Sequence, residues 1–169
     1  MKAFTALLTP DEARKAFARV YVPAPLGVER ALLMPALDRV LAEEVRAGTD
    51  LPAFDRSTVD GYAVRSADTT RASSGTPVDL ALVGEVLMGE PVAFAVAAGR
   101  AARIPTGGRL PDDADAVVMQ EHVVRRDGAV AVERPVRPGE NVVRRGDDVR
   151  AGDLILRPGR RLRPQDLGL

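Results

Sequence analysis

The chain has 169 residues, of which 46% are hydrophobic and 28% are charged, and its formal net charge is zero. This is the composition of an ordinary globular protein with room for one domain or two small ones. The balanced charge gives no general attraction to nucleic acid or to acidic membranes, so we expect neither as a partner. The absence of cysteine excludes disulfides and cysteine metal sites, and no apolar run approaches the length of a membrane span. We therefore expect a cytoplasmic protein.

The N-terminal part predicts one clear helix. Thr9, Pro10 and Glu12 make a typical helix start, with a capping threonine, a proline in the first turn and the glutamate of a capping box. The helix should run to about Val20, because the segment Val22-Pro-Ala-Pro25 breaks it. Three shorter elements are expected after it: extended segments at residues 28–33 and 41–45, and a short helix at residues 35–40.

The chain after Gly48 has a β-rich pattern, with short apolar runs between turn residues. Strands are expected at residues 78–86, 94–97 and 102–104. The strongest hairpin signal joins residues 116–123 to residues 129–132 through an Asp-Gly turn. A second hairpin is expected between residues 153–156 and residues 161–163.

Two turns carry candidate binding groups. In Ser57-Thr58-Val59-Asp60-Gly61, a carboxylate stands directly before a glycine, where a turn can hold it toward a metal or a phosphorylated ligand. The alternative is an Asx-turn that only caps a loop, and the local sequence alone favours it. In Thr106-Gly107-Gly108, a hydroxyl and two glycines can offer backbone N–H groups to an anion. The alternative here is a plain strand-ending turn, which the local sequence again favours.

Other charged residues have weaker functional signals. The pair Asp147-Asp148 follows two arginines and a glycine, and it can either bind Mg²⁺ or form a surface ion-pair turn. Glu121 should lie at the end of a strand, with His122 on the opposite face, so we interpret His122 as structural or surface-exposed. The arginines near the end of the sequence, Arg157 to Arg163, have no aromatic residues between them. This predicts a solvated turn rather than a nucleic-acid patch.

Taken in order, these motifs resemble one family. The stretches LPAFDRSTVDGYAVRSAD, GEVLMGEPV, ARIPTGGRLPDDADAVVMQEHV and RPGENVVRRGDDVRAGDLILRPGRRLRPQDLGL are similar to the molybdopterin molybdenumtransferase family, which includes the matching domain of gephyrin. The similarity covers nearly the whole chain from about Val28. Two small departures are Ser57-Thr58-Val59, where the family commonly has Ser-Ala-Met, and Gly108, where alanine is frequent.

The resemblance implies an α+β, β-rich fold, in which a small discontinuous α/β domain has an inserted, mainly antiparallel β domain. We expect the discontinuous domain, used for linking and dimerisation, at residues 1–45 plus 146–169. The inserted domain, with the DGYA and TGG motifs, is expected at residues 46–145. Residues 163–169 resemble the start of a further helix, so we expect a fragment in which the family's pterin-binding domain and C-terminal barrel are absent.

The implied activity is the insertion of molybdenum from molybdate into adenylylated molybdopterin, with release of AMP and assistance by Mg²⁺. Residue by residue, the catalytic positions of the family fall on Asp60, Thr106 and Asp148, and the resemblance implies that Asp60 and Asp148 hold the metal. The implied cofactor-binding positions are Ser57, Gly61, Gly107 and Glu121. The resemblance also implies a homodimer, and a molybdopterin adenylyltransferase as the upstream enzyme.

The resemblance permits a second class of function. Gephyrin-like proteins use this architecture for protein binding, so the chain is alternatively a dimerisation or protein-binding scaffold. A pure scaffold has no reason to retain Asp60, Thr106 and Asp148 together, which favours the enzyme. A generic β-rich binding domain explains the strands but not the ordered motifs. In the enzyme interpretation, the isolated chain is expected to be inactive because the family's cleft needs the pterin-binding domain as its other wall.

Overall fold

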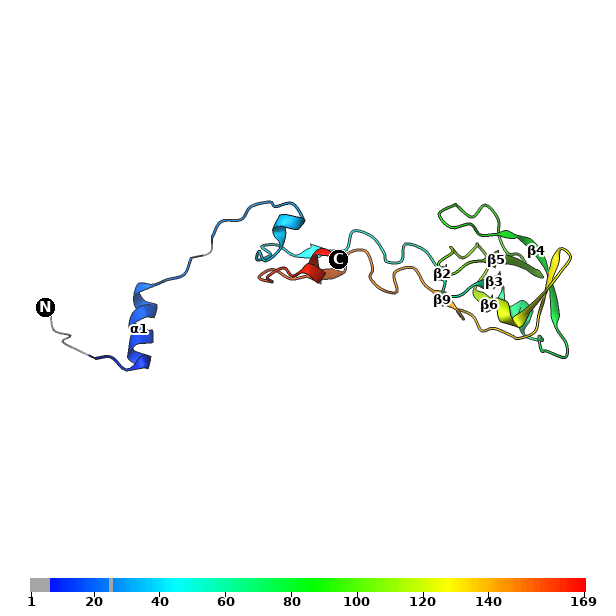
Figure 1. Cartoon of the computed structure of the whole chain (residues 1–169), viewed down its shortest axis with the longest axis horizontal. Helices are drawn as coiled ribbons and strands as arrows, with labels where there is room; N and C mark the ends of the chain where they lie inside the picture. Colours follow the sequence, from blue (N-terminus) through cyan, green and yellow to red (C-terminus); the bar gives the residue numbers. More distant parts are fainter. Residues whose placement is uncertain (1–6, 25) are drawn as a thin grey trace. The chain divides into compact units, whose positions relative to one another are not determined.

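The computed structural model describes residues 7–24 and 26–169, and it is strand-rich with few helices (Figure 1). The chain forms two compact units, Met1–Ala42 with Gly159–Leu169, and Glu43–Pro158. The α+β, β-rich fold class predicted from the sequence is confirmed. The predicted domain bounds, 1–45 plus 146–169 and 46–145, stay a prediction. Among the described residues, no helix has the length and apolar character that crossing a membrane requires.

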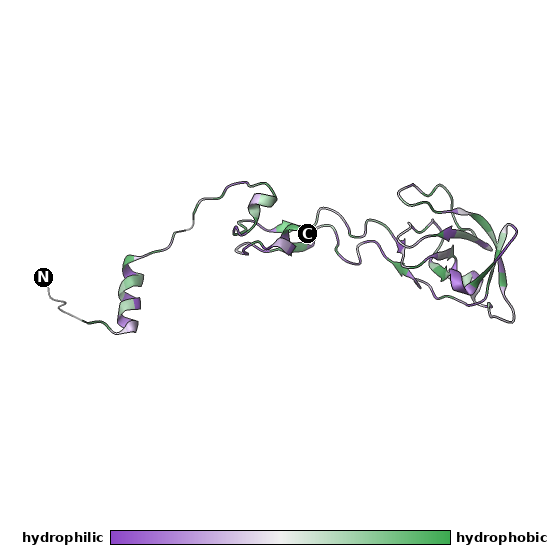
Figure 2. Cartoon of the chain, in the orientation of Figure 1, coloured by the Kyte–Doolittle hydropathy of each residue, from purple (hydrophilic) through white to green (hydrophobic). Residues whose placement is uncertain are grey.

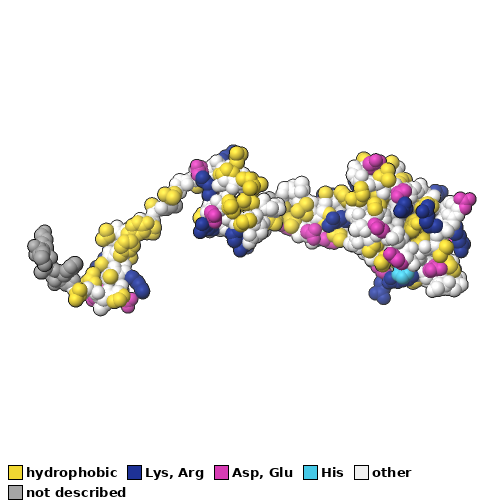
Figure 3. Space-filling model, in the orientation of Figure 1, with side chains coloured by type: hydrophobic (Ala, Val, Ile, Leu, Met, Phe, Trp, Pro, Cys, Tyr) yellow, Lys and Arg dark blue, Asp and Glu magenta, His cyan; other side chains and the backbone are white. Residues whose placement is uncertain are grey.

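The first unit contains the predicted N-terminal helix, α1 (Pro10–Val20). The capping box is confirmed, because the Glu12 carboxylate accepts a hydrogen bond from Thr9 N at 2.8 Å and Thr9 Oγ1 accepts one from Glu12 N at 3.3 Å. The helix ends at Val20, as predicted, while Pro25 of the predicted breaker lies outside the described residues. None of the residues of α1 is buried, and hydrophobic side chains lie exposed along it (Figure 3).

The segment after α1 has less regular structure than predicted. Residues 28–33 form no strand, since no other described segment offers them backbone hydrogen bonds. The predicted helix at residues 35–40 is only a 3-10 turn, η1 (Met34–Ala36). The expected extended segment at residues 41–45 becomes a strand only at its end, β1 (Val45–Arg46).

The second predicted hairpin, between residues 153–156 and 161–163, is wrong. The strand β10 (Leu154–Leu156) pairs with β1 instead, and Leu162 exchanges backbone hydrogen bonds with Asp38 and Arg39. The Pro-Gly turn forms, with Gly159 at a φ of +81°, but each side of the turn pairs with a segment from earlier in the chain. After it comes the short helix α2 (Pro164–Leu167). There, the Arg160 guanidinium donates to the buried Asp166 carboxylate and holds the pKa of that carboxyl far below its usual value.

A six-stranded sheet forms the centre of the second unit, with the strand order β6-β3-β5-β4-β8-β7 (Figure 1). All neighbours pair antiparallel except β4 and β5, which are parallel. The strands are β3 (Gly61–Val64), β4 (Val78–Glu85), β5 (Arg100–Ile104), β6 (Ala116–Met119), β7 (Val123–Arg126) and β8 (Ala129–Val132). The unit also has a two-stranded pair, β2 (Arg56–Ser57) with β9 (Val142–Val143), and the 3-10 turns η2 (Ser66–Thr69) and η3 (Gln120–His122).

The strand β3 lies at the centre of the packing, and every one of its residues is buried. Its side chains alternate between two hydrophobic clusters, since Tyr62 and Val64 belong to one and Ala63 to the other. Both faces of the strand are therefore covered by protein, which explains its unbroken apolar run. Figure 2 shows both hydrophobic and hydrophilic residues on the strands of this unit.

The predicted strand at residues 116–123 is interrupted. It ends as β6 at Met119, passes through η3, and resumes as β7, so that β6 and β7 lie at opposite ends of the strand order of a curled sheet. Gln120 N still donates to the carbonyl oxygen of Asp60 at 3.1 Å, in line with the β3–β6 register, and the interruption follows this last hydrogen bond. The Asp-Gly hairpin between β7 and β8 is confirmed, with Gly128 at a φ of +68°. The predicted strand at residues 94–97 is reduced to a single bridge between Ala95 and Asp112.

Candidate functional site

The sheet register brings Asp60 and Thr106 together. Asp60 directly precedes β3, Thr106 follows the end of β5, and these strands pair antiparallel with Gly61 opposite Ile104. The start of one strand therefore meets the end of the other. Asp60 Oδ1 accepts hydrogen bonds from both the backbone N of Thr106, at 2.7 Å, and its side-chain Oγ1, at 2.9 Å. The other carboxylate oxygen, Oδ2, has no hydrogen-bond partner among the described residues.

These two hydrogen bonds stabilise the ionised form of Asp60. The backbone N–H of Thr106, then its hydroxyl, hold the pKa of the Asp60 carboxyl below its usual value, and the charge of Arg103 lowers it further. Desolvation acts in the opposite direction but is outweighed, because the side chain is exposed. The result is a solvent-facing carboxylate that is fixed in position through one oxygen and open to a ligand through the other.

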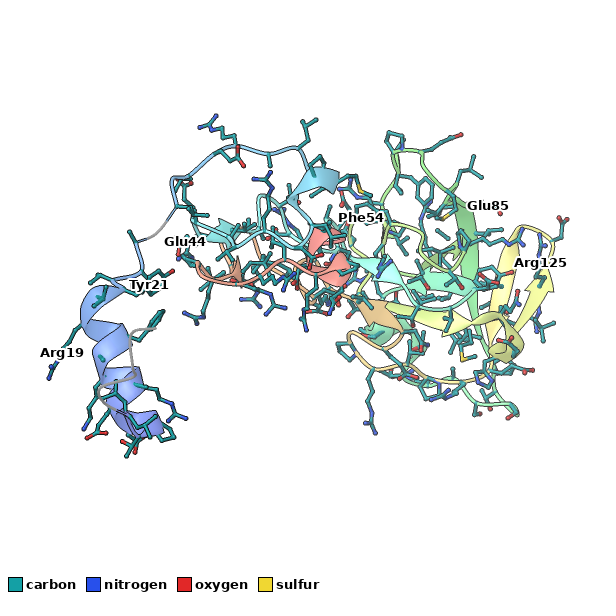
Figure 4. The ribbon with its side chains drawn as sticks, turned by 60° about the vertical axis from the view of Figure 1, so that its left-hand side comes forward. Arg19, Tyr21, Glu44, Phe54, Glu85 and Arg125 are labelled. Carbon is teal, nitrogen blue, oxygen red and sulfur yellow. The ribbon has the colours of Figure 1, made fainter. Side chains whose placement is uncertain are left out.

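A small hollow of about 150 Å³ lies beside this carboxylate. Its walls come from the ends of β3, β4 and β5 and from η3: Asp60, Gly61, Tyr62, Glu85, Arg103, Ile104, Pro105 and Gln120. Glu85 on β4 is one of the side chains marked in Figure 4, and it forms an ion pair with Arg103 on the neighbouring strand, with 3.0 Å between nitrogen and oxygen. A carboxylate, a guanidinium and a second carboxylate therefore share one hollow.

Gly61 is required here for space. A Cβ atom at this position would overlap the backbone carbonyl of Val118 on the paired strand β6. The close approach of β3 and β6 sets the point at which β3 begins, and with it the position of Asp60. The role of Gly61 in the structure is thus to position its neighbour, whereas direct contact with a cofactor stays a prediction.

The Thr-Gly-Gly segment is a strand-ending turn, the second of the two alternatives set out above. Its three backbone N–H groups are all used inside the protein: Thr106 N by Asp60, Gly107 N by Ser57 O at 2.8 Å, and Gly108 N by Pro105 O at 2.9 Å. Gly107 has a φ of +82°, which glycine adopts without strain. The turn therefore offers no free row of backbone donors to a phosphate, and ligand binding by Gly107 has no support from a contact.

Ser57 is buried, and its hydroxyl stabilises the turn before Asp60. Its hydroxyl donates to Val59 O at 2.6 Å and accepts from Val59 N at 3.2 Å, so both of its hydrogen-bonding functions are satisfied locally. Its backbone N also donates to Gly108 O, which links the two motif turns to each other. A ligand-binding role for Ser57 remains a prediction.

For Asp148, the structure shows a backbone hydrogen bond but no side-chain hydrogen bond or ion pair among the described residues. Its backbone N donates to Leu51 O at 3.0 Å, but its exposed side chain has no hydrogen-bond or ion-pair partner among the described residues. Asp147 accepts from Arg144 N at 2.8 Å and thereby closes the turn. The arginines of this segment pair elsewhere, Arg144 with Asp55 at 2.7 Å and Arg145 with Asp50 at 2.5 Å. No described contact joins Asp148 to Asp60 or Thr106, so their common role in catalysis and metal binding stays a prediction.

Glu121 and His122 lie in η3 rather than in a strand, which corrects the expectation that they point to opposite sheet faces. Glu121 is exposed and has no side-chain partner among the described residues, and its role as a ligand stays a prediction. His122 Nε2 lies 3.4 Å from Arg134 Nη1.

The carboxylates do not form a complete metal cage. Within residues 7–24 and 26–169, no three His, Cys, Asp or Glu side chains are placed to hold a metal ion together. Mg²⁺, however, is commonly bound by one or two carboxylates, with waters and substrate phosphates as the other ligands. The unpaired Oδ2 of Asp60 is compatible with one such ligand.

A larger hollow of about 1120 Å³ lies elsewhere in the second unit, over the segment from Arg134 to Glu140 and beside Ser66 and Thr70. It contains none of the predicted site residues. We place the candidate site at the smaller hollow because a carboxylate that Thr106 orients and a guanidinium both line it.

Sequence reasoning did not single out Arg103, Glu85 or Gln120. The first two stand within the predicted strands at residues 102–104 and 78–86, near the ends of those strands. A charged residue in an otherwise apolar strand, close to a predicted ligand-binding turn, was the available signal. That they share a hollow with Asp60 depends on the parallel pairing of β4 with β5, which the sequence does not show.

Known proteins match this chain closely. The sequence profile of the MoeA N-terminal region (domain I and II) matches residues 8–169. The molybdopterin molybdenumtransferase of Synechococcus elongatus is 41% identical over 86% of this chain, and that of Haemophilus influenzae is 35% identical over 96%. The crystal structure of the molybdopterin biosynthesis moeA protein from Pyrococcus horikoshii OT3 superposes with a TM-score of 0.78 and 44% identity over 83% of the chain.

The chain covers 36% and 39% of the lengths of these two relatives, and 37% of the crystallised protein. It therefore corresponds to about a third of each, and the profile assigns that third to the first two domains. The profile match over nearly the whole chain, together with the shared fold, leads to one conclusion: the chain belongs to the family of the MoeA N-terminal region.

Proposed function

We propose that this chain is the N-terminal part of an enzyme of molybdenum cofactor biosynthesis, which inserts molybdenum from molybdate into adenylylated molybdopterin and releases AMP. The family membership and the names of the relatives support the role in this biosynthesis. One observation in the structure supports the reaction: the Asp60 carboxylate is fixed through one oxygen by Thr106 and presents its other oxygen beside Arg103.

Each of these groups has a defined task in the proposal. Thr106 fixes the orientation of Asp60 and stabilises its ionised form, which lowers the pKa of the carboxyl. Asp60 Oδ2 is the group that would hold Mg²⁺, with Asp148 proposed as a second ligand. When bound, the cation would offset the negative charge of the phosphates during loss of AMP. Arg103 adds a fixed positive charge to the same hollow.

The size of the hollow indicates that it is one part of a larger site. Small-molecule sites commonly enclose about 300–1,000 Å³, and the hollow at Asp60 encloses about 150 Å³. A tetrahedral anion fits such a space, whereas a pterin with its nucleotide does not. We infer that the rest of the substrate binds to parts of the protein other than this chain.

The proposed reaction is tested by Asp60→Asn in the full-length protein that contains this chain. The amide keeps the shape of the side chain but removes its charge, so molybdate-dependent release of AMP should fall about 100-fold. Asp79→Asn is the matched control, since Asp79 is an exposed carboxylate on β4 that pairs with Arg126 and does not line the hollow. Its AMP release should equal that of the wild type. Unchanged AMP release by Asp60→Asn would refute the proposed role of Asp60.

The isolated 169-residue chain should be inactive in the same assay, because it contains only part of the site. Turnover by the isolated chain, at a rate similar to that of the full-length protein, would contradict this expectation and show that the chain contains a complete active site.

The scaffold alternative, with a second copy of the chain as partner, has one observation in its favour. On α1, Phe17 and Val20 are 65% and 87% exposed, and such apolar stripes commonly pack against another helix. Light scattering of the wild type and of Phe17→Ser with Val20→Ser decides whether this stripe holds a homodimer. Ala18→Ser, on the same helix, is the control. A dimer that dissociates only in the double variant would support the dimerisation scaffold. If the wild type and both variants are monomers, the scaffold alternative is refuted. The molybdopterin adenylyltransferase remains a proposed upstream partner.

A further inference from the structure

The hollow beside Asp60 contains an ion pair whose cation is only partly used. Arg103 on β5 and Glu85 on β4 are register partners on neighbouring parallel strands, and Arg103 Nη1 donates to Glu85 Oε1 at 3.0 Å. Both side chains are about half exposed, at 50% and 49%. The remaining guanidinium nitrogens, Nε and Nη2, have no partner among the described residues. Arg103 is therefore able to donate to a ligand while it is still held by Glu85.

The position of this guanidinium suits an anion. Arg103 lines the same hollow as Asp60. Its positive charge lowers the pKa of the Asp60 carboxyl, although less than the two hydrogen bonds from Thr106 do. An anion that enters the hollow meets two carboxylates, Asp60 and Glu85, which repel it. Arg103 is the only cationic side chain among the described residues that line this hollow. Its planar group of N–H donors matches the oxygen edge of a tetrahedral anion.

We propose that Arg103 binds a tetrahedral oxyanion of the substrates in the hollow beside Asp60, and that Glu85 competes with that anion for the guanidinium. The inference rests on the proposed function, of which it names a binding residue. Two substrate groups share this chemistry, the phosphoryl group of the adenylyl moiety and molybdate itself. The volume of the hollow, about 150 Å³, admits either group but not a whole nucleotide.

Removing the charge of Glu85 distinguishes anion binding by Arg103 from a purely structural role of the ion pair. If the pair only supports the fold, removing either partner has the same small effect, since exposed ion pairs contribute little to stability. If Glu85 competes with an anion for Arg103, removing the Glu85 charge strengthens anion binding. Removing the Arg103 charge then weakens the binding. Opposite effects of the two substitutions are thus the specific signature.

The experiment measures the binding of AMP and of molybdate, each alone, to the full-length protein by calorimetry. Arg103→Gln should weaken one of the two probes about tenfold, the size of a lost hydrogen bond to a charged group. Glu85→Gln should tighten the same probe about threefold, in line with the modest strength of an exposed pair. In the double variant, the loss of Glu85 should tighten binding less than it does alone, because no guanidinium is left to be freed. An effect on AMP identifies the phosphoryl group as the ligand, and an effect on molybdate identifies the metal oxyanion.

The matched control is Arg125→Gln. Arg125 is an exposed arginine on β7 of the same sheet, it has no ion-pair partner among the described residues, and it does not line the hollow (Figure 4). It should leave both affinities unchanged. The inference is overturned if the wild type binds neither probe, if Arg103→Gln changes neither affinity, or if Glu85→Gln weakens binding as Arg103→Gln does. These results do not depend on AMP release, so unchanged AMP release by Asp60→Asn refutes the role of Asp60 without deciding the role of Arg103.

Discussion

At the scale of single residues, the two hydrogen bonds from Thr106 orient Asp60 and stabilise its ionised form. Both donors of Thr106, the backbone N–H and the hydroxyl, act on one oxygen of Asp60, and the backbone donor is the larger cause of the lowered pKa. Thr106 therefore lowers the pKa of Asp60 mainly through its backbone N–H, and its hydroxyl lowers that pKa further. Asp60 is consequently an oriented carboxylate with one oxygen free of hydrogen bonds from the described residues.

Substituting Thr106 separates these two contributions. In Thr106→Val, the pKa of Asp60 should rise, because the hydroxyl donor is lost, but it should stay below its usual value, because the backbone donor remains. Thr70→Val is the control, since its hydroxyl bonds only to Ala67 O in the turn η2. A pH titration of the Asp60 carboxyl carbon by NMR measures the shift. An unchanged pKa in Thr106→Val would show that the hydroxyl does not donate to Asp60.

The same shift has a consequence for stability. A carboxyl whose pKa is lower in the folded chain than in the unfolded chain stabilises the fold above the unfolded value, about pH 4. This contribution is lost as the pH falls through the lowered pKa of the folded state. Wild type and Thr106→Val should therefore differ in stability at neutral pH and converge in strong acid, as measured by urea unfolding between neutral pH and pH 2.

At the scale of elements, the sequence predicted those parts that depend on local chemistry. The capping box of α1 and the Asp-Gly hairpin of β7 and β8 need only near neighbours in the chain, and both are confirmed. The hairpin predicted for residues 153–163 failed because its strand β10 pairs with β1, more than 100 residues earlier. The hollow beside Asp60 was missed for the same reason, since it depends on which distant strands become neighbours.

Gly61 offers a test of how the sheet positions the site. In Gly61→Ala, the added methyl group would overlap the carbonyl of Val118, so β3 and β6 must move apart. We expect a loss of about 1–3 kcal/mol in the free energy of unfolding. The hydrogen bonds from Thr106 to Asp60 should also weaken. Gly75→Ala is the control, because a Cβ atom there meets nothing within 4 Å. Urea unfolding of both variants measures the difference, and equal stability would show that β3 tolerates a wider spacing.

At the scale of the whole molecule, the candidate site and both hydrophobic clusters belong to a single unit, Glu43–Pro158. The clusters draw on residues between Val59 and Val142, and the pair β1–β10 closes this unit near its two ends. The unit therefore contains its own core, which is the usual requirement for independent folding. The site does not need the other unit to bring Asp60, Thr106 and Arg103 together.

A chain of residues 43–158 should accordingly fold by itself. We expect one cooperative unfolding transition, a β-rich circular dichroism spectrum, and a free energy of unfolding within about 0.5 kcal/mol of that transition in the 169-residue chain. A chain of residues 65–158 is the matched control, since it lacks β2 and β3, and β3 separates β5 from β6 in the sheet. It should show no cooperative transition. If the chain of residues 43–158 also unfolds without cooperativity, the core of this unit depends on segments outside it, and the position of Asp60 beside Arg103 depends on them as well.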